Sequence, residues 1–152
     1  MEFKRINDIE TLVKMRMTYL NYDFPGTSEE ELAKINAALP EYFNKHIDKD
    51  MFAFAAVEDG TVISGAFLVI IEKPANPAFP TGKIGNVLNV FTLEQYRRKG
   101  IAARVMKMLM EYAEGSRLDF LELKATSDGY PLYKKLGFSE EASSYTSMKF
   151  YF

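Results

Sequence analysis

Three consecutive cations and a glycine mark the point at which the sequence predicts that a strand gives way to a helix. Arg97, Arg98 and Lys99 stand directly before Gly100. The apolar residues that follow share one face of the expected helix: Ile101, Val105, Met108, Leu109 and Tyr112. A helix N-terminus carries partial positive charge and unpaired N–H donors, so cations placed there oppose the helix dipole unless an anion binds. The segment therefore predicts a site for phosphate or pyrophosphate, with a solvated basic turn as the alternative.

Cysteine and histidine, which serve many catalytic and metal sites, are scarce in this chain. It has no cysteine, which excludes disulfides, thiolate nucleophiles and cysteine-based metal sites. His46 is the only histidine, so a metal site built from several histidines is excluded and a serine–histidine–aspartate triad is disfavoured. We expect no metal site, and we expect His46 to lie at the surface or at the end of a helix.

The composition is that of a soluble globular protein. Hydrophobic residues make up 47% and charged residues 26% of the 152 residues, which suits one domain with a full core. A net charge of −2 argues against a general nucleic-acid binder. The longest unbroken apolar run, residues 51–57, is too short to span a bilayer, and residues 1–5 carry no apolar signal core. We therefore expect a cytoplasmic protein with no membrane or nucleic-acid partner.

The spacing of apolar residues predicts the elements that must position the basic segment. Strands are expected at residues 3–6, 51–57, 62–71, 83–92, 118–124 and 144–152. Two helices are expected after the N-caps Asn7 and Ser28, and a third runs from Gly100 to Gly115. A short fourth helix is expected at residues 128–136.

The order of these elements indicates a mixed α/β fold. A strand and two helices come first, then three strands, followed by a helix, a strand, a helix and a last strand. Pro40 predicts a kink or break within the second helix, and Gly65 predicts a bulge in the third strand. We interpret residues 1–152 as a single domain, because no linker or repeat divides them.

Two short motifs are informative together. Residues 97–102 read Arg-Arg-Lys-Gly-Ile-Ala, and residues 131–138 read Pro-Leu-Tyr-Lys-Lys-Leu-Gly-Phe. The first resembles the signature of the GNAT superfamily of N-acetyltransferases, which is Arg or Gln, two variable residues, Gly, one variable residue, and Gly or Ala. The second resembles the Leu-Tyr-x-x-x-Gly-Phe segment of the same superfamily. The resemblance extends along essentially the whole chain and implies the GNAT acyltransferase fold, in which helices flank a central, mixed, mostly antiparallel sheet.

The resemblance also implies acetyl-CoA as cosubstrate and a site for it around the basic segment. Main-chain N–H groups would hold the pyrophosphate at the positions that match the signature: Arg98, Lys99, Gly100, Ile101, Ala102 and Ala103. The pantetheine arm would pair with the main chain of the preceding strand, at Val90, Phe91 and Thr92. We expect the side chains of that strand to serve the core.

The same resemblance implies two catalytic residues. Tyr133 matches the tyrosine that acts as general acid in many relatives, and a phenol with a pKa of about 10 can protonate a departing thiolate. A partly buried structural tyrosine is the alternative. Glu122 lies on the strand that carries a catalytic glutamate in some relatives, and an exposed strand residue is the alternative there.

The chain also departs from the family pattern. Glu94 stands where many relatives have proline, and residues 126–129 contain no asparagine to contact the cofactor, for which Ser127 is a weak substitute. Tyr22 and Asp23 fall in a loop that often lines the acceptor pocket of this fold.

We interpret the chain as an N-acetyltransferase that moves an acetyl group from acetyl-CoA to a primary amine by direct transfer. The lack of cysteine removes the most obvious covalent carrier. The alternative is a non-catalytic acyl-CoA-binding sensor or regulatory module with the same fold; a different nucleotide binder is disfavoured because the chain has no Walker motif. The sequence does not identify the acceptor amine, which could be a small molecule or a peptide. The aromatic C-terminal strand could pair with a second copy, which suggests a homodimer.

Overall fold

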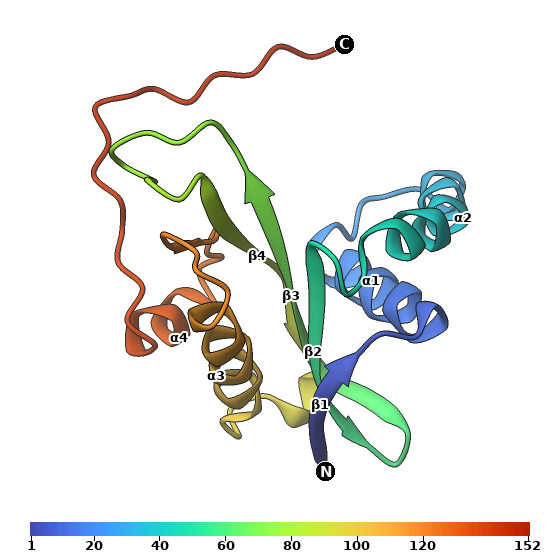
Figure 1. The fold of residues 1–152 in the computed structure, drawn as a ribbon. Helices are drawn as coiled ribbons and strands as arrows, with labels where there is room; N and C mark the ends of the chain where they lie inside the picture. Colours follow the sequence, from blue (N-terminus) through green and yellow to red (C-terminus); the bar gives the residue numbers. More distant parts are fainter.

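The computed structural model describes residues 1–152, and a five-stranded sheet forms its centre (Figure 1). The strands lie side by side in chain order: β1 (Glu2–Ile6), β2 (Met51–Glu58), β3 (Thr61–Glu72), β4 (Lys83–Thr92) and β5 (Leu121–Glu122). Strands β1 to β4 pair antiparallel, whereas β5 runs parallel to β4. The expected mixed, mostly antiparallel sheet is therefore confirmed.

Helices cover both faces of this sheet. They are α1 (Ile9–Asp23), α2 (Glu29–His46), α3 (Ile101–Glu114) and α4 (Tyr130–Lys135), with a short 3₁₀ turn, η1 (Glu94–Tyr96), before α3. Helices α1 and α2 lie on one side of the sheet, and α3 and α4 lie on the other (Figure 1). None of the helices combines the length and the apolar character needed to cross a membrane.

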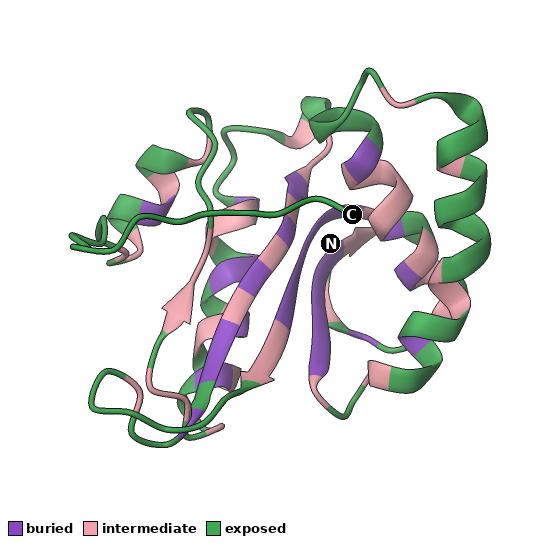
Figure 2. Cartoon of the chain, turned by 90° about the horizontal axis from the view of Figure 1, so that it is seen from above, coloured by how far each residue is buried: buried purple, intermediate pink, exposed green.

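Strand β2 shows how the sequence builds a core on each face of the sheet. Its first six residues are all buried, and successive side chains of a strand point to opposite faces (Figure 2). Phe52 and Phe54 join the apolar cluster beneath α3. Met51 and Ala53 join the cluster beneath α1 and α2. An unbroken apolar run thus supplies two cores, one on each side of the sheet.

A bulge in β4 lies opposite Gly65 of β3. Gly65 pairs with Phe91, but the register shifts before Phe67 because β4 contributes an extra residue. The irregularity includes Asn89, whose φ of 58° lies in the left-handed region. A Cβ on Gly65 would lie 2.5 Å from the Cε atom of Met15, so a larger residue there would force the Met15 side chain to move. An irregularity therefore occurs in the pairing at Gly65, but the bulge lies in β4 and not, as predicted, in β3.

The structure corrects the predicted cap of the first helix and excludes a break, though it does not test a kink, in the second. Asp8, not Asn7, caps α1, because the Asp8 side chain accepts a hydrogen bond from the N–H of Thr11. Helix α2 runs through Pro40 without a break. Proline removes one hydrogen bond from the helix, and the burial of Phe43 on the next turn holds the helix against the core in spite of that loss.

The C-terminal part of the chain departs furthest from the prediction. Strand β5 is limited to Leu121–Glu122, rather than residues 118–124, because its pairing with β4 ends at Asn86. The strand expected at residues 144–152 does not form: these residues are all exposed and make no hydrogen bond between main-chain groups. A strand needs a neighbour for its N–H and C=O groups, and no strand lies beyond β5 in this sheet.

Candidate active site

The N-terminus of α3 presents a continuous row of free main-chain donors. Gly100 caps the helix with a φ of 74° and offers no side chain to the first turn. The N–H groups of residues 98–103 donate no hydrogen bond within the chain. By contrast, Asp8 caps α1, and Ser28 with Glu31 forms the predicted capping box on α2. Helix α3 therefore keeps free the donors that the other two long helices satisfy with side chains.

None of the three cations beside these donors forms an ion pair. Arg98 and Lys99 are exposed and form no ion pair. Arg97 instead donates from Nε to the carbonyl of Thr92 over 3.1 Å, which fixes the turn that leads into α3. A Cβ placed on Gly100 would meet no atom within 4 Å, so the space at the helix end is open. Free donors, unpaired positive charge and open space fit a phosphate or pyrophosphate group.

A gap opens between β4 and β5. Strand β5 pairs with β4 only as far as Asn86, and β4 continues to Thr92 with no strand on that side. The carbonyl of Phe91 faces β3, because it accepts a hydrogen bond from Ser64 Oγ over 2.8 Å. Main-chain groups alternate between the two edges of a strand, so the N–H and C=O of Val90 face the gap. This open edge offers hydrogen bonds to an extended ligand.

The side chains along this part of β4 serve the core, as the sequence predicts. Phe91 is only 7% exposed and belongs to the cluster beneath α1 and α2. Val90 packs against the cluster beneath α3. The Oγ1 atom of Thr92 lies 2.8 Å from Ser64 Oγ. The part of this stretch that remains available to a ligand in the gap is therefore the main chain.

Tyr133 lies on α4 with a buried ring and a free hydroxyl. The ring packs edge-on against Phe138 with 6.0 Å between ring centroids, and it joins the core beneath α3. Its hydroxyl makes no hydrogen bond with a protein group. Every fully buried side-chain N or O atom of the chain has a hydrogen-bond partner, so the hydroxyl of Tyr133 must be in contact with solvent. Burial raises the pKa of Tyr133, and the negative charge of Asp23 raises it further. The phenol therefore keeps its proton at neutral pH.

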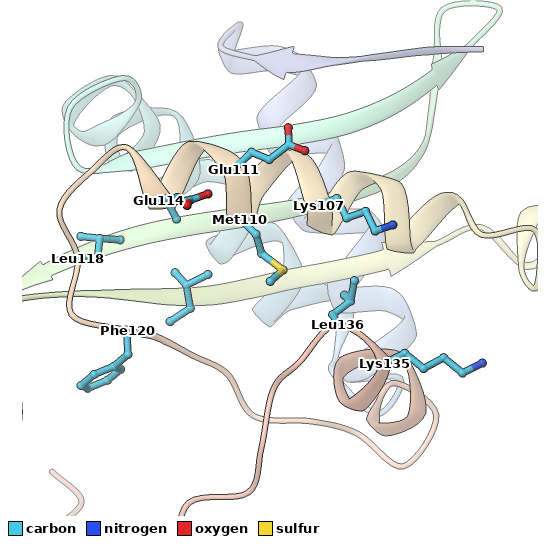
Figure 3. A pocket seen from close by; sticks show the side chains of 10 residues that line it. Lys107, Met110, Glu111, Glu114, Leu118, Phe120, Lys135 and Leu136 are labelled. Atoms are coloured by element: carbon cyan, nitrogen blue, oxygen red, sulfur yellow. The ribbon is translucent and has the colours of Figure 1, made fainter.

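Glu122 lines the same groove as Tyr133. This groove of about 730 Å³ runs beside β5 and is bordered by α4. A second groove of about 520 Å³ lies between α3 and α4 (Figure 3). It contains none of the site residues predicted from the sequence, and its apolar lining includes Met110, Leu118 and Leu136. The two predicted catalytic residues thus meet in one groove, and the groove of Figure 3 lies outside the candidate site.

A polar cluster at the end of α1 is not predicted from the sequence. The hydroxyl of Tyr19 donates to Asp23 Oδ2 over 2.7 Å, and Arg16 Nη1 donates to Asn89 Oδ1 over 3.2 Å. Burial, followed by the contact with Asp23, raises the pKa of Tyr19 to about 12. Burial also lowers the pKa of Arg16. After burial, the negative charge of Asp23 is the second cause that raises the pKa of Tyr133, so the cluster is electrostatically linked to the phenol of α4.

The sequence held one signal for this cluster. Arg16 is a charged residue within an otherwise apolar helical stripe: Ile9, Leu12, Val13 and Leu20. An arginine directed toward a core requires polar partners, and here they include Asn89 and the ring of Tyr19, 5.5 Å away. Tyr22 and Asp23, expected in a loop, are the last residues of α1, and the Arg97 guanidinium lies 5.3 Å from the Tyr22 ring centroid.

Comparison with known proteins gives a consistent result. The family model described as "Acetyltransferase (GNAT) family" matches residues 12–138. An N-alpha-acetyltransferase from Sulfurisphaera tokodaii is 36% identical over 129 residues, which cover 75% of this chain and 76% of that protein.

Two solved structures share the fold over nearly the full chain. A predicted acetyltransferase from Clostridium acetobutylicum, solved with acetyl-CoA, superposes with a TM-score of 0.83 at 25% identity and covers 97% of this chain and 95% of its own. A GCN5-related N-acetyltransferase from Ralstonia eutropha superposes with a TM-score of 0.76 at 26% identity and covers 97% of each chain.

Proposed function

This chain belongs to the GNAT family of acetyltransferases, and we propose that it moves an acetyl group from acetyl-CoA directly to a primary amine. The observation that carries the proposal is the row of free N–H groups at residues 98–103. No capping side chain accepts hydrogen bonds from these groups, so they are available to a ligand. Acetyl-CoA supplies an activated thioester, whose sulfur must leave when the amine attacks. The chain therefore has to hold the donor, take a proton from the amine and give a proton to the sulfur.

The donor is held by main chain rather than by side chains. The free N–H groups of residues 98–103 are the partners for the pyrophosphate, and the charges of Arg98 and Lys99 favour its approach. The open edge of β4 at Val90 is the partner for the amide groups of the pantetheine arm. Only the short turn with η1 separates the end of β4 from the N-terminus of α3, so we propose that a single extended ligand contacts both.

Tyr133 is the proposed general acid. Its hydroxyl holds a proton at neutral pH, has no protein partner to compete for it, and stands in a groove beside the end of β5. As the nitrogen–carbon bond forms and the carbon–sulfur bond breaks, the phenol gives its proton to sulfur and is later reprotonated from solvent. If the ring served only to fill the core, a hydroxyl without a hydrogen-bond partner in the protein would contribute nothing to it.

Two carboxylates are candidates to receive the proton of the amine. Glu122 lines the groove that contains Tyr133. Asp23 acts electrostatically on Tyr133 and is held by the hydroxyl of Tyr19. A carboxylate at either position attracts the ammonium form of an acceptor and can take its proton before attack. Separate Glu122→Gln and Asp23→Asn variants distinguish them, because the base should lose kcat at neutral pH and recover part of it at higher pH.

The α-amine of a peptide is the acceptor class to test first. The relative from Sulfurisphaera tokodaii, an N-alpha-acetyltransferase, is 36% identical to this chain. Peptides with different first residues should be compared with polyamines and amino sugars at equal concentration. Mass spectrometry of the products then shows which nitrogen carries the acetyl group.

Release of free CoA thiol is the measurement that tests the proposal. The protein has no cysteine, so it adds no thiol signal of its own. We expect release that depends on the amine, and a fall in kcat of about 10²- to 10⁴-fold for Tyr133→Phe at unchanged affinity for acetyl-CoA. Tyr42→Phe, which removes a phenol from α2, is the matched control and should leave the rate unchanged. Tight acetyl-CoA binding without release for any amine would favour a non-catalytic sensor instead.

A further inference from the structure

Arg16 of α1 is a half-buried cation without a counter-ion in the chain. It takes part in none of the ion pairs of the structure. Its Nη1 atom donates to Asn89 Oδ1 over 3.2 Å, and its guanidinium carbon lies 5.5 Å from the ring centroid of Tyr19. Moving a charge out of water costs free energy unless an opposite charge compensates it. Arg16 therefore has the surroundings of a cation that an anion from outside the chain completes.

The guanidinium of Arg16 still has donors to offer. Only Nη1 donates a hydrogen bond within the chain, and a guanidinium carries several other N–H groups. Every fully buried side-chain nitrogen of the chain has a hydrogen-bond partner, so the unused N–H groups of Arg16 face solvent. Parallel N–H groups of a guanidinium match the oxygens of a carboxylate. A carboxylate can therefore bind Arg16 while Asn89 keeps its hydrogen bond.

Asn89 places Arg16 beside the open edge of β4. The Asn89 side chain is buried, and its N–H donates to the carbonyl of Met15 over 3.3 Å, so α1 and β4 are joined here by hydrogen bonds in both directions. The next residue of β4 is Val90, whose N–H and C=O face the gap between β4 and β5. Arg16 is thus bonded to the residue that precedes the proposed partner of the pantetheine arm.

An anion at Arg16 is distinct from the phosphate groups of the acetyl donor. The free N–H groups proposed to hold the pyrophosphate begin α3, which covers one face of the sheet. Helix α1, which carries Arg16, covers the opposite face (Figure 1). The anion at Arg16 therefore approaches the gap from the side opposite the pyrophosphate, as an acceptor would.

A carboxylate lies farther along the same face of α1. Residues three and seven positions apart share one face of a helix, so Tyr19 and Asp23 lie on the side of Arg16. Tyr19 connects the two charges, because its ring lies beside the guanidinium and its hydroxyl donates to Asp23 Oδ2 over 2.7 Å. Seven residues of helix rise about 10 Å. Helix α1 thus offers a cation and an anion, which match the carboxylate and the ammonium group of an amino acid.

We propose that Arg16 binds a carboxylate of the acceptor, so that the preferred amines are those that also carry an acid group. This role of Arg16 rests on the proposed function and narrows its acceptor class. The carboxylate can belong to a free amino acid or to the acidic first residue of a peptide. Polyamines and neutral amino sugars lack it and should be poor acceptors.

Matched pairs of acceptors test the preference and distinguish its two sources. Each common amino acid is compared with its α-amide, and peptide amides that begin with aspartate are compared with those that begin with asparagine. We expect kcat/KM for CoA release to be about 10- to 100-fold higher with the acid of at least one kind of pair. The first kind of pair identifies a free amino acid, and the second identifies a peptide.

Arg16→Gln removes the charge and keeps a side-chain N–H for Asn89. It should lower kcat/KM with acid acceptors about 10- to 100-fold, mainly through KM, and change it little with their neutral partners. Arg16→Lys keeps the charge without the planar fork and should keep part of the preference. Lys14→Gln, the matched control, removes an exposed cation that pairs with Glu10 on the same helix and should keep all of it. An equal loss with both members of each pair would mean that Arg16 only braces Asn89, and would overturn the proposal.

Binding of the reaction products gives a readout that needs neither a variant nor turnover. N-acetyl derivatives of each acid and of its neutral partner are titrated calorimetrically into the natural protein saturated with CoA. We expect the acid to bind about 10-fold or more tightly in at least one pair. Equal binding within every pair, or no binding of any acid, would overturn the carboxylate site. Release of CoA without a preference for acids would contradict this site alone, whereas acid binding that depends on Arg16, with no release for any amine, would contradict the proposed function alone.

Discussion

Gly100→Ala is the substitution that examines the phosphate site most closely. Gly100 has a φ of 74°, and a Cβ there meets no atom within 4 Å, so the free protein gains strain but no clash. An alanine in the left-handed region costs about 1–2 kcal/mol. For a domain of this size, each kcal/mol lowers the melting temperature by about 2–4 °C. The variant should therefore fold, with a melting temperature a few degrees below that of the natural chain.

The larger effect of Gly100→Ala should be on acetyl-CoA. The added methyl group occupies the open space beside the free N–H groups, and the loss of one hydrogen bond to a charged group costs about 1.5–3 kcal/mol. Such a loss weakens binding by about 10- to 150-fold. Acetyl-CoA at 100 times its dissociation constant stabilises the natural protein by about 2.7 kcal/mol, but a variant that binds 100-fold more weakly gains only about 0.4 kcal/mol.

Gly60 provides a matched control within the same chain. It lies in the turn between β2 and β3 with a φ of 75°, and a Cβ there also meets no atom within 4 Å. Gly60→Ala should lower the melting temperature by the same few degrees and keep the full shift with acetyl-CoA, measured by differential scanning calorimetry with ATP as a competing nucleotide. If Gly100→Ala also kept the full shift, the phosphate groups would not bind at the N-terminus of α3.

Three further predictions follow from particular contacts. Tyr133→Phe should change the free energy of unfolding by less than about 0.5 kcal/mol, because its hydroxyl has no protein partner, and urea titration would show a larger loss if the hydroxyl were structural. Ser28→Ala removes the capping box of α2 and should cost about 1 kcal/mol; an unchanged urea midpoint would mean that this cap does not stabilise the helix. The raised pKa of Tyr19, about 12 against 10 in the unfolded chain, stabilises the fold fully below pH 10, and that stabilisation is lost as the pH rises toward 12. Tyr19→Phe should therefore show a shallower loss of stability over that interval, and parallel curves for the two proteins would contradict the assignment.

The elements nearest the basic segment could be predicted from the sequence because their signals are local. Cations before a glycine, followed by apolar residues at helical spacing, place the start of α3 at Ile101. Strand β4 and the irregularity opposite Gly65 were predictable for the same reason. Alternating apolar residues indicate a strand, and a glycine within a strand indicates an irregularity in its pairing. The free N–H groups at residues 98–103 follow directly from a helix start that lacks a capping side chain.

The acceptor side could not be predicted in the same way because it depends on contacts between distant residues. The link between Asp23 and Tyr133 is electrostatic and exists only in the folded chain, where the charge of Asp23 raises the pKa of Tyr133. The error at residues 144–152 has a related cause. The strand pattern of that segment is real, but a strand also requires an edge to pair with, and a single chain does not provide that pairing in this structure. Pattern alone therefore predicts what a segment can form, not which partner it uses.

The most direct test of the account is a titration of the ¹⁵N-labelled protein with acetyl-CoA, followed amide by amide in solution. The amide signals of residues 98–103 should shift most, together with that of Val90, because these N–H groups are free to bind phosphate and pantetheine. Signals from α2, which lies on the other face of the sheet from α3, should move little. Binding that shifted other amides and left residues 98–103 unchanged would contradict the central claim that the N-terminus of α3 holds the acetyl donor.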